Sequence, residues 1–320
     1  MGLIDFAGSG VVHLTGGICA LVGAIFAGPR VGRFPNKGVC GCFTPGEPSP
    51  SKVAPLEPHN RVYATLGALL LWFGWYGFNA GSTLGISAYG DIAGRVTVTT
   101  TLAAASGAIV SMCASLIMVK PRCRTFDVMA PLNGILAGLV SITANCHVTT
   151  PEGSVGIGLI GGAVYVGSSF LLKMLRIDDP LDAFSVHGAC GIWGVLAGGI
   201  FGNPEYICGD GTTDCINFYA QFAMQLIGVL CIVAWTAATS TVLFVILRFT
   251  KLLRPSVASE IRGLDFEHHR GYTGVIRYKQ EEEATKEGYP ADDIKKGPSS
   301  RVTPHGPPSA NLPVVNVTAQ

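Results

Sequence analysis

The sequence predicts an all-α polytopic membrane protein, and three observations support this prediction. Only 13% of the residues are charged and 48% are hydrophobic, while the 42 glycines are spread through apolar sequence instead of being gathered in linkers. Several long stretches contain no Asp, Glu, Lys or Arg. Two of those stretches carry a histidine in closely similar local sequence, which is rare inside lipid-length apolar segments.

Seven charge-free stretches define the predicted membrane spans. They cover residues 6–29, 62–90, 96–119, 128–151, 153–172, 183–204 and 215–247. Each has about 20 residues or more, enough to cross roughly 30 Å of hydrocarbon as a helix. Backbone groups in lipid must satisfy their own hydrogen bonds, so these segments are expected to be helices despite their Val, Thr and Gly content.

Two domains are predicted from this pattern. Residues 1–247 form the membrane domain, and residues 248–320 form a tail of mixed charge that becomes rich in Pro and Ser. The composition of the tail's last part is typical of disorder.

The distribution of basic residues predicts the orientation. The connections on one side carry ten Lys and Arg residues: Arg30, Arg33, Lys37, Lys52, Arg61, Lys120, Arg122, Arg124, Lys173 and Arg176. The connections on the other side carry only Arg95. Since basic connections stay in the cytosol, we expect the amino terminus outside, the carboxyl terminus in the cytosol, and the chain in the cell membrane.

His13 and His187 lie in the first and sixth spans, which cross the membrane in opposite directions. Gly17 and Gly191 follow the two histidines at the same offset. Similar sequence in opposite orientation indicates an inverted repeat, with a conduction path where the repeats meet. The alternatives are a chance similarity of short motifs, and two buried histidines that serve only packing.

The second span carries a stripe of three residues that could recruit a cation. Trp75, Phe78 and Ser82 recur at helical spacing, so they share one face. Aromatic faces attract cations and a hydroxyl accepts hydrogen bonds from N–H groups. The alternative is ordinary helix packing.

Two carboxylates precede the histidine helices. Asp5 comes before the first span and Asp182 before the sixth. Both are expected to cap helix N–H groups. Direct contact of Asp5 with a cation is the alternative.

The ten cysteines form no recognisable metal pattern, and no cofactor is predicted. Cys208 and Cys215 flank an acidic outer loop where oxidation could join them. We find no nucleophile and base at a spacing that would indicate an enzyme. Nothing in the charge pattern indicates nucleic acid as a partner.

Three segments resemble the ammonium transporter family, and most closely its eukaryotic Amt branch. They are residues 5–13 (DFAGSGVVH), 72–82 (WFGWYGFNAGS) and 178–188 (DDPLDAFSVHG). The tail segment 260–265 (EIRGLD), followed by His269, is similar to that branch's regulatory tail. The resemblance covers about residues 5–272.

The resemblance implies an inverted-repeat fold that begins at the fifth of eleven helices, with the first four helices absent. It implies that His13 and His187 are the twin-histidine pore, that Phe78 is one of two stacked gate rings, and that Ser82 belongs to the outer recruitment site. It places Asp5 near that site, where Asp5 would act indirectly by fixing backbone carbonyls.

For the tail, the resemblance implies that the segment with Glu260, Gly263, Asp265 and His269 touches a neighbouring subunit in a homotrimer. The predicted function is therefore transport of ammonium, or of ammonia with or without the proton, across a lipid bilayer. The alternatives are a Rhesus-like neutral gas channel, a transporter-derived ammonium sensor, and a non-functional fragment.

Overall fold

The computed structural model describes residues 2–31, 33–34, 60–85, 87–118, 127–209, 217–256, 259–260 and 264. The chain divides into two compact units, one of residues 1–35 with 53–254 and the other of residues 36–52 with 255–320. The first unit contains the helices discussed below. Among its described residues β structure is limited to one isolated bridge between Thr149 and Gly202.

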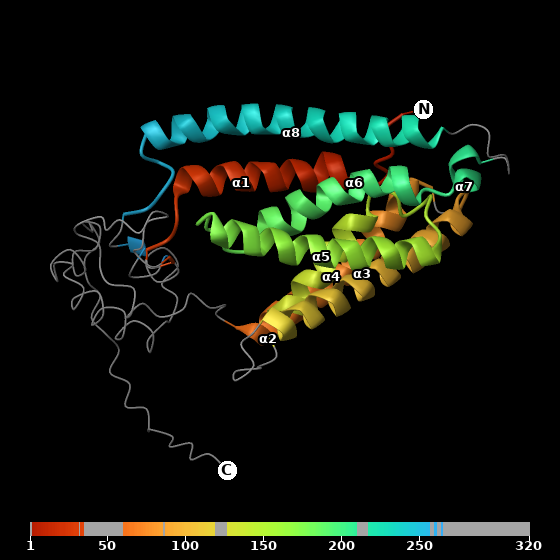
Figure 1. The fold of residues 1–320 in the computed structure, drawn as a ribbon, viewed down its shortest axis with the longest axis horizontal. Coiled ribbons are helices and arrows are strands. Elements are labelled where there is room, and N and C mark those ends of the chain that lie inside the picture. The colour runs from red at the N-terminus through yellow and green to blue at the C-terminus, as the bar shows by residue number, and fades with distance from the viewer. Residues whose placement is uncertain are drawn as a thin grey trace, which may run out of the picture. The chain divides into compact units, whose positions relative to one another are not determined.

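The first unit is built mainly from α-helices (Figure 1). The helices are α1 Thr15–Ala27, α2 Arg61–Ala80, α3 Gly90–Met118, α4 Met129–Ile142, α5 Pro151–Met174, α6 Cys190–Phe201, α7 Pro204–Cys208 and α8 Phe218–Phe249. Two π-helical segments, η1 Ser9–Leu14 and η5 Phe184–Ala189, lead directly into α1 and α6. A 3-10 turn, η3 Gly81–Thr83, follows α2.

Each of the seven predicted spans contains a helix. Within the described part of the chain, five helical stretches are long and apolar enough to cross a membrane: Ser9–Ala27, Gly90–Ile117, Pro151–Met174, Phe184–Phe201 and Phe218–Phe249. The two other spans correspond to α2 and to the shorter apolar helix α4. The predicted all-α polytopic class is confirmed.

The predicted span 128–151 was wrong at its end, because α4 stops at Ile142. The following residues turn and bind the amino-terminal segment. Phe6 N donates to Ala144 O at 2.8 Å, and Ala7 N donates to Thr143 O at 3.1 Å. Apolar sequence alone could not reveal this stop, since its hydrogen-bond partners lie more than a hundred residues away in the chain.

The boundary between the second and third predicted spans was also wrong. α2 ends at Ala80, and Leu84 adopts a left-handed backbone conformation with φ 57°. α3 then begins at Gly90 and includes Asp91 and Arg95. Charged residues had marked the predicted ends, but Asp91 suits a first helical turn and the Arg95 guanidinium lies over the Tyr206 ring at 3.8 Å from its centroid.

Small residues let α3, α4 and α5 pack closely. A Cβ at Gly107 would lie 2.5 Å from Gly134 O, and one at Gly138 would lie 2.1 Å from Ala103 O. Such close backbone approach is a common basis of helix association in membranes. The long helix α8 runs beside α1 on another side of the unit (Figure 1).

α8 also holds the amino-terminal segment through a buried amide. Gln225 is fully buried; its Oε1 accepts from Ile4 N at 2.7 Å, and its Nε2 donates to Ile4 O and Val195 O, each at 2.7 Å. These bonds position the residues just before η1, and so position the first histidine.

Candidate functional site

The helices that carry the two histidines, η1 with α1 and η5 with α6, cross each other as an antiparallel pair. A Cβ at Gly17 would lie 2.1 Å from Gly188 N, and one at Gly191 would lie 2.9 Å from Leu14 N. In each case a glycine four residues after one histidine contacts the residue directly after the other. The matched glycines of the sequence are therefore the contact points of the crossing.

This crossing brings His13 and His187 together. Their Nδ1 atoms lie 3.2 Å apart, and their ring centroids are 5.2 Å apart with an interplanar angle of 16°. His13 is 8% exposed, and its Nε2 is buried without a hydrogen-bond partner among the described residues. The two Nδ1 atoms are thus within hydrogen-bonding distance of each other, while Nε2 of His13 is available to a further partner.

Two aromatic rings from α2 lie next to His13. The Trp75 ring stacks on the His13 ring at 5.1 Å and 14°, and the Phe78 ring lies 5.7 Å from it. Trp75 is buried and its Nε1 donates to Thr143 Oγ1 at 3.0 Å, whereas Phe78 is 40% exposed. Trp75 is therefore held against His13 by burial and a hydrogen bond, whereas Phe78 contacts His13 with a partly exposed ring.

Ser82 lies beyond Phe78, in the 3-10 turn at the end of α2. Its Oγ donates to Phe78 O at 2.8 Å, which leaves the oxygen lone pairs available as acceptors. The predicted stripe of Trp75, Phe78 and Ser82 continues past the end of the α-helix, because η3 extends it.

Asp5 caps the first π-helical segment. Its two carboxylate oxygens accept from Gly10 N at 3.0 Å and Val11 N at 2.9 Å. Burial raises the pKa of this carboxyl, although hydrogen bonds from backbone N–H groups lower it in part. This geometry corresponds to the capping role expected for Asp5.

The expectation that Asp182 caps the second segment was wrong. Asp179 does so, accepting from Ala183 N and Phe184 N, each at 2.8 Å. Burial raises the pKa of Asp179 as well. Asp179 precedes His187 by eight residues, and Asp5 precedes His13 by eight, so comparing the two offsets would have identified it.

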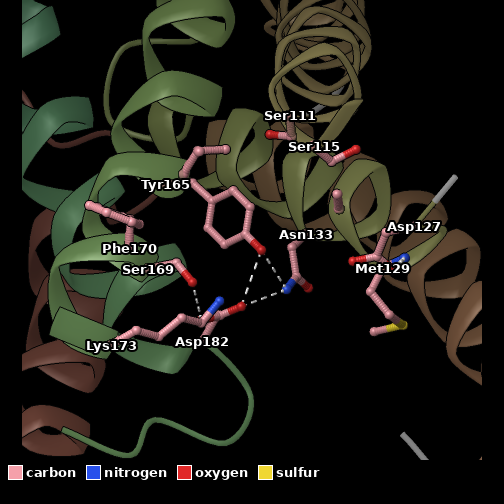
Figure 2. Close-up of a pocket in the computed structure, with 12 residues that line it drawn as sticks. Ser111, Ser115, Asp127, Met129, Asn133, Tyr165, Ser169, Phe170, Lys173 and Asp182 are labelled. Atoms are coloured by element: carbon pink, nitrogen blue, oxygen red, sulfur yellow. Dashed lines mark hydrogen bonds between the residues drawn. The ribbon is translucent and has the colours of Figure 1, made fainter. Parts of the chain in front are cut away.

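Asp182 has a different part in the repeat. It adopts φ 53°, and Gly8, at the same offset before His13, adopts φ 99°. A residue with left-handed backbone conformation therefore precedes each of the two π-helical segments. The Asp182 side chain accepts hydrogen bonds from Asn133, Tyr165 and Ser169 (Figure 2).

An ion-pair cluster joins the segment after α1 to the segment before η5. Arg30 Nε lies 2.7 Å and Arg33 Nε 3.3 Å from Asp178, whose side chain is 1% exposed. Burial alone would raise the pKa of Asp178, but the hydrogen bonds and charges of these arginines outweigh it and the pKa is lowered. Nothing in the local sequence pattern had indicated this cluster.

Other predicted residues are only partly described. Of the tail residues, Glu260 is described, and Gly263, Asp265 and His269 lie outside the described residues. Cys208 is disulfide-bonded, while Cys215, its expected partner, lies outside the described residues. The described residues contain no group of three or more His, Cys, Asp or Glu that could hold a metal ion.

Comparison with known proteins places this chain in a family. The model of the Ammonium Transporter Family matches residues 1–273. Ammonium transporter 1 member 3 of Solanum lycopersicum is 38% identical over 291 residues, covering 85% of this chain and 60% of that protein. Ammonium transporter 1 member 2 of Arabidopsis thaliana is 34% identical over 338 residues, covering 99% and 60%.

Solved structures show the same relationship. A structure described as a sensor Amt protein superposes with a TM-score of 0.69 at 34% identity, covering 83% of this chain and 60% of that one. Saccharomyces cerevisiae Mep2 superposes with a TM-score of 0.65 at 31% identity, covering 80% and 55%. The chain spans about 60% of the length of the curated relatives named above.

The antiparallel histidine helices and their apolar neighbours define a polytopic helical membrane protein built on a transporter fold. The chain belongs to the Ammonium Transporter Family, and its relatives place it in the eukaryotic-type Amt branch.

Proposed function

We propose that this chain takes part in moving ammonium across a membrane, along a path that passes Phe78, His13 and His187. The observation that carries the proposal is the His13–His187 pair, joined through Nδ1 atoms 3.2 Å apart inside an otherwise apolar helix crossing. The names of the chain's relatives support ammonium as the substrate.

The chemistry of the pair suits ammonia. Bare ammonium would be very costly to bring into hydrocarbon, so its water must be replaced or its charge removed. The rings of Trp75 and Phe78 offer a cation–π face of roughly 0.5–2 kcal/mol, and Ser82 offers a hydroxyl acceptor. Beyond them, a neutral imidazole can hydrogen-bond ammonia with one nitrogen and pass a proton with the other.

The same arrangement would discriminate against potassium. A potassium ion has no N–H group to donate to the unpaired Nε2 of His13 and no proton to give up, so it can neither hydrogen-bond to the rings nor lose its charge there. Ammonia has both a lone pair and N–H donors, and both match the donor and acceptor nitrogens of the rings.

Assembly and orientation form part of the proposal. The exposed apolar side chains of α2, including Leu70 at 62% and Phe73 at 77% exposure, suit contact with lipid or with further helices. We place the amino terminus outside and the tail in the cytosol. We assign a homotrimer, in which the tail segment with Glu260, Gly263, Asp265 and His269 contacts a neighbouring subunit.

Expression of the chain in cells that lack ammonium transporters tests the proposal. We expect uptake of labelled methylammonium above the empty-vector level, and at least a tenfold reduction in His13→Leu and His187→Leu at equal membrane abundance. Phe78→Ala should also reduce uptake, while Phe73→Ala, on the same helix but facing outward, should not. Unchanged uptake in both histidine variants would rule out the pore assignment.

A second candidate function is ammonium sensing. It is favoured by the superposition on the structure described as a sensor Amt protein. A sensor would bind ammonium but conduct little, so saturable binding without uptake distinguishes it from a transporter. A neutral gas channel would move ammonia without current, and ammonium-evoked currents in voltage-clamped cells would exclude it.

A further inference from the structure

A cavity of about 270 Å³ lies away from the histidine pair, among the end of α3, the start of α4 and the end of α5. In Figure 2, Ser111 and Ser115 lie at one side, Asp182 and Lys173 at another, and Asn133 between them. Many of its lining residues are polar, although the helices around it are apolar. The role proposed above does not use this cavity.

The Asp182 carboxylate is held in the cavity by several hydrogen bonds. Its Oδ2 accepts from Asn133 Nδ2 at 3.2 Å and Tyr165 OH at 3.1 Å, and its Oδ1 accepts from Ser169 Oγ at 2.8 Å. Three donors from two helices thus hold one carboxylate in place. A carboxylate oxygen can accept more than one hydrogen bond, so Oδ1 keeps capacity for a further donor.

Ser111 supplies a second and independent observation. It is fully buried, its hydroxyl has no hydrogen-bond partner among the described residues, and it lines the cavity. Leaving a buried hydroxyl unpaired costs free energy, so such a group indicates an absent partner. Ser106, which precedes Ser111 on α3, is also buried, but its hydroxyl donates a hydrogen bond to Ala103 O at 3.2 Å.

The remaining groups favour a ligand that donates hydrogen bonds. Ser115 Oγ gives its proton to Met112 O, and one oxygen of Asp127 accepts from Met129 N, so both retain free acceptor lone pairs. Two carboxylates, Asp127 and Asp182, face one ammonium, Lys173, which gives the lining a net charge of −1. No ion pair within 4.0 Å joins Lys173 to either aspartate.

We infer that this cavity binds a small cation bearing N–H donors, namely ammonium or a small primary ammonium ion, at a site separate from the histidine pair. The cation would donate to the Asp182 carboxylate, and a water molecule held beside the cation would donate to the Ser111 hydroxyl. A water molecule occupies about 30 Å³ of liquid, so the cavity has room for such an ion with several waters. The choice of ammonium as the probe rests on the proposed function.

The test uses the purified full chain in detergent micelles. Its thermal unfolding midpoint is followed as ammonium chloride replaces sodium chloride at constant ionic strength. We expect a saturable rise, because a ligand that binds the folded state stabilises it. Methylammonium should act similarly, and potassium, which has no donors, should not; equal stabilisation by potassium would overturn the proposed donor requirement.

Four variants locate the binding. Ser111→Ala should weaken the apparent affinity about tenfold, because it removes the acceptor for the water that accompanies the cation, and a bridging water is nearly as favourable as a direct hydrogen bond. Asp182→Asn should abolish the effect, and Lys173→Met should tighten binding roughly twofold to fivefold by removing a nearby positive charge. Ser106→Ala is the matched control and should leave the affinity unchanged.

The outcomes separate this site from the pore. Asp182→Asn loses a hydrogen-bonded anion and could fail to fold; Ser111→Ala and Lys173→Met break no described hydrogen bond, so those two suffice. If His13→Leu retains the ammonium-dependent rise while Ser111→Ala weakens it, the cavity is the site. If His13→Leu abolishes the rise and Ser111→Ala does not weaken it, the cavity proposal is overturned and the pore proposal stands.

Discussion

His13 Nδ1 and His187 Nδ1 lie 3.2 Å apart, so the two imidazoles face each other through like nitrogens. A hydrogen bond at this distance requires a proton on one Nδ1 and a lone pair on the other. The two rings must therefore hold different tautomers, or share one proton between them.

This relationship predicts the nitrogen spectrum of the pair. In the chain with ¹⁵N-labelled histidine, one Nδ1 of the pair should be protonated and the other unprotonated at neutral pH. His13→Leu and His187→Leu difference spectra assign the signals to the two rings. Protonation of both Nδ1 atoms in the intact chain would contradict the geometry.

The glycine contacts at the crossing predict a large effect of one methyl group. Gly17→Ala would place a Cβ 2.1 Å from the backbone nitrogen of Gly188, which cannot move aside like a flexible side chain. We expect destabilisation of about 3 kcal/mol, the upper end for overpacking. Thermal unfolding in micelles measures it.

Gly16 is the matched control for that change. It is the neighbouring residue on α1, and a Cβ there would meet nothing within 4 Å. Gly16→Ala should be neutral or stabilising by up to about 1 kcal/mol, because alanine favours helix. Equal losses in both variants would mean that the crossing does not determine the effect.

Gln225 is predicted to hold the amino-terminal segment in place. Gln225→Leu would leave Ile4 N, Ile4 O and Val195 O without this partner, which should cost about 2 kcal/mol. Hydrogen exchange should also speed up at residues 4–8. Leu226→Ala, at a position 42% exposed, should leave that exchange unchanged; unaltered exchange in Gln225→Leu would refute the role.

Asp178 predicts a pH dependence of stability. Its folded pKa is lowered, because the bonds and charges of Arg30 and Arg33 outweigh burial. The folded state therefore binds this proton less tightly than the unfolded chain, so the stabilisation is present above an unfolded pKa of about 3.9 and is lost as pH falls through the folded value.

Asp178→Asn should cost about 2 kcal/mol at neutral pH and should flatten the acid side of the stability profile. Denaturant unfolding at several pH values measures both. Glu152→Gln, an exposed carboxyl in the first turn of α5, is the control and should leave the profile nearly unchanged. An Asp178→Asn profile parallel to that of the original chain would contradict the assignment.

Much of the architecture was predictable because membrane helices are specified locally. An uncharged stretch near 20 residues must satisfy its own backbone hydrogen bonds, and each predicted stretch contains a helix. The histidine pair was also predictable, since His13 and His187 share their local sequence. Their facing Nδ1 atoms were not, because the crossing at Gly17 and Gly191 sets the ring orientation.

Local composition and repeated motifs were enough to predict the all-α membrane class, to relate His13 to His187 and to indicate the family. The end of α4 at Ile142, the capping of η5 by Asp179 and the place of Asp182 in a polar cavity emerged only from the folded chain. Spans follow from the composition of neighbouring residues, whereas the stop of α4 and the polar cavity depend on hydrogen bonds to residues distant in the chain.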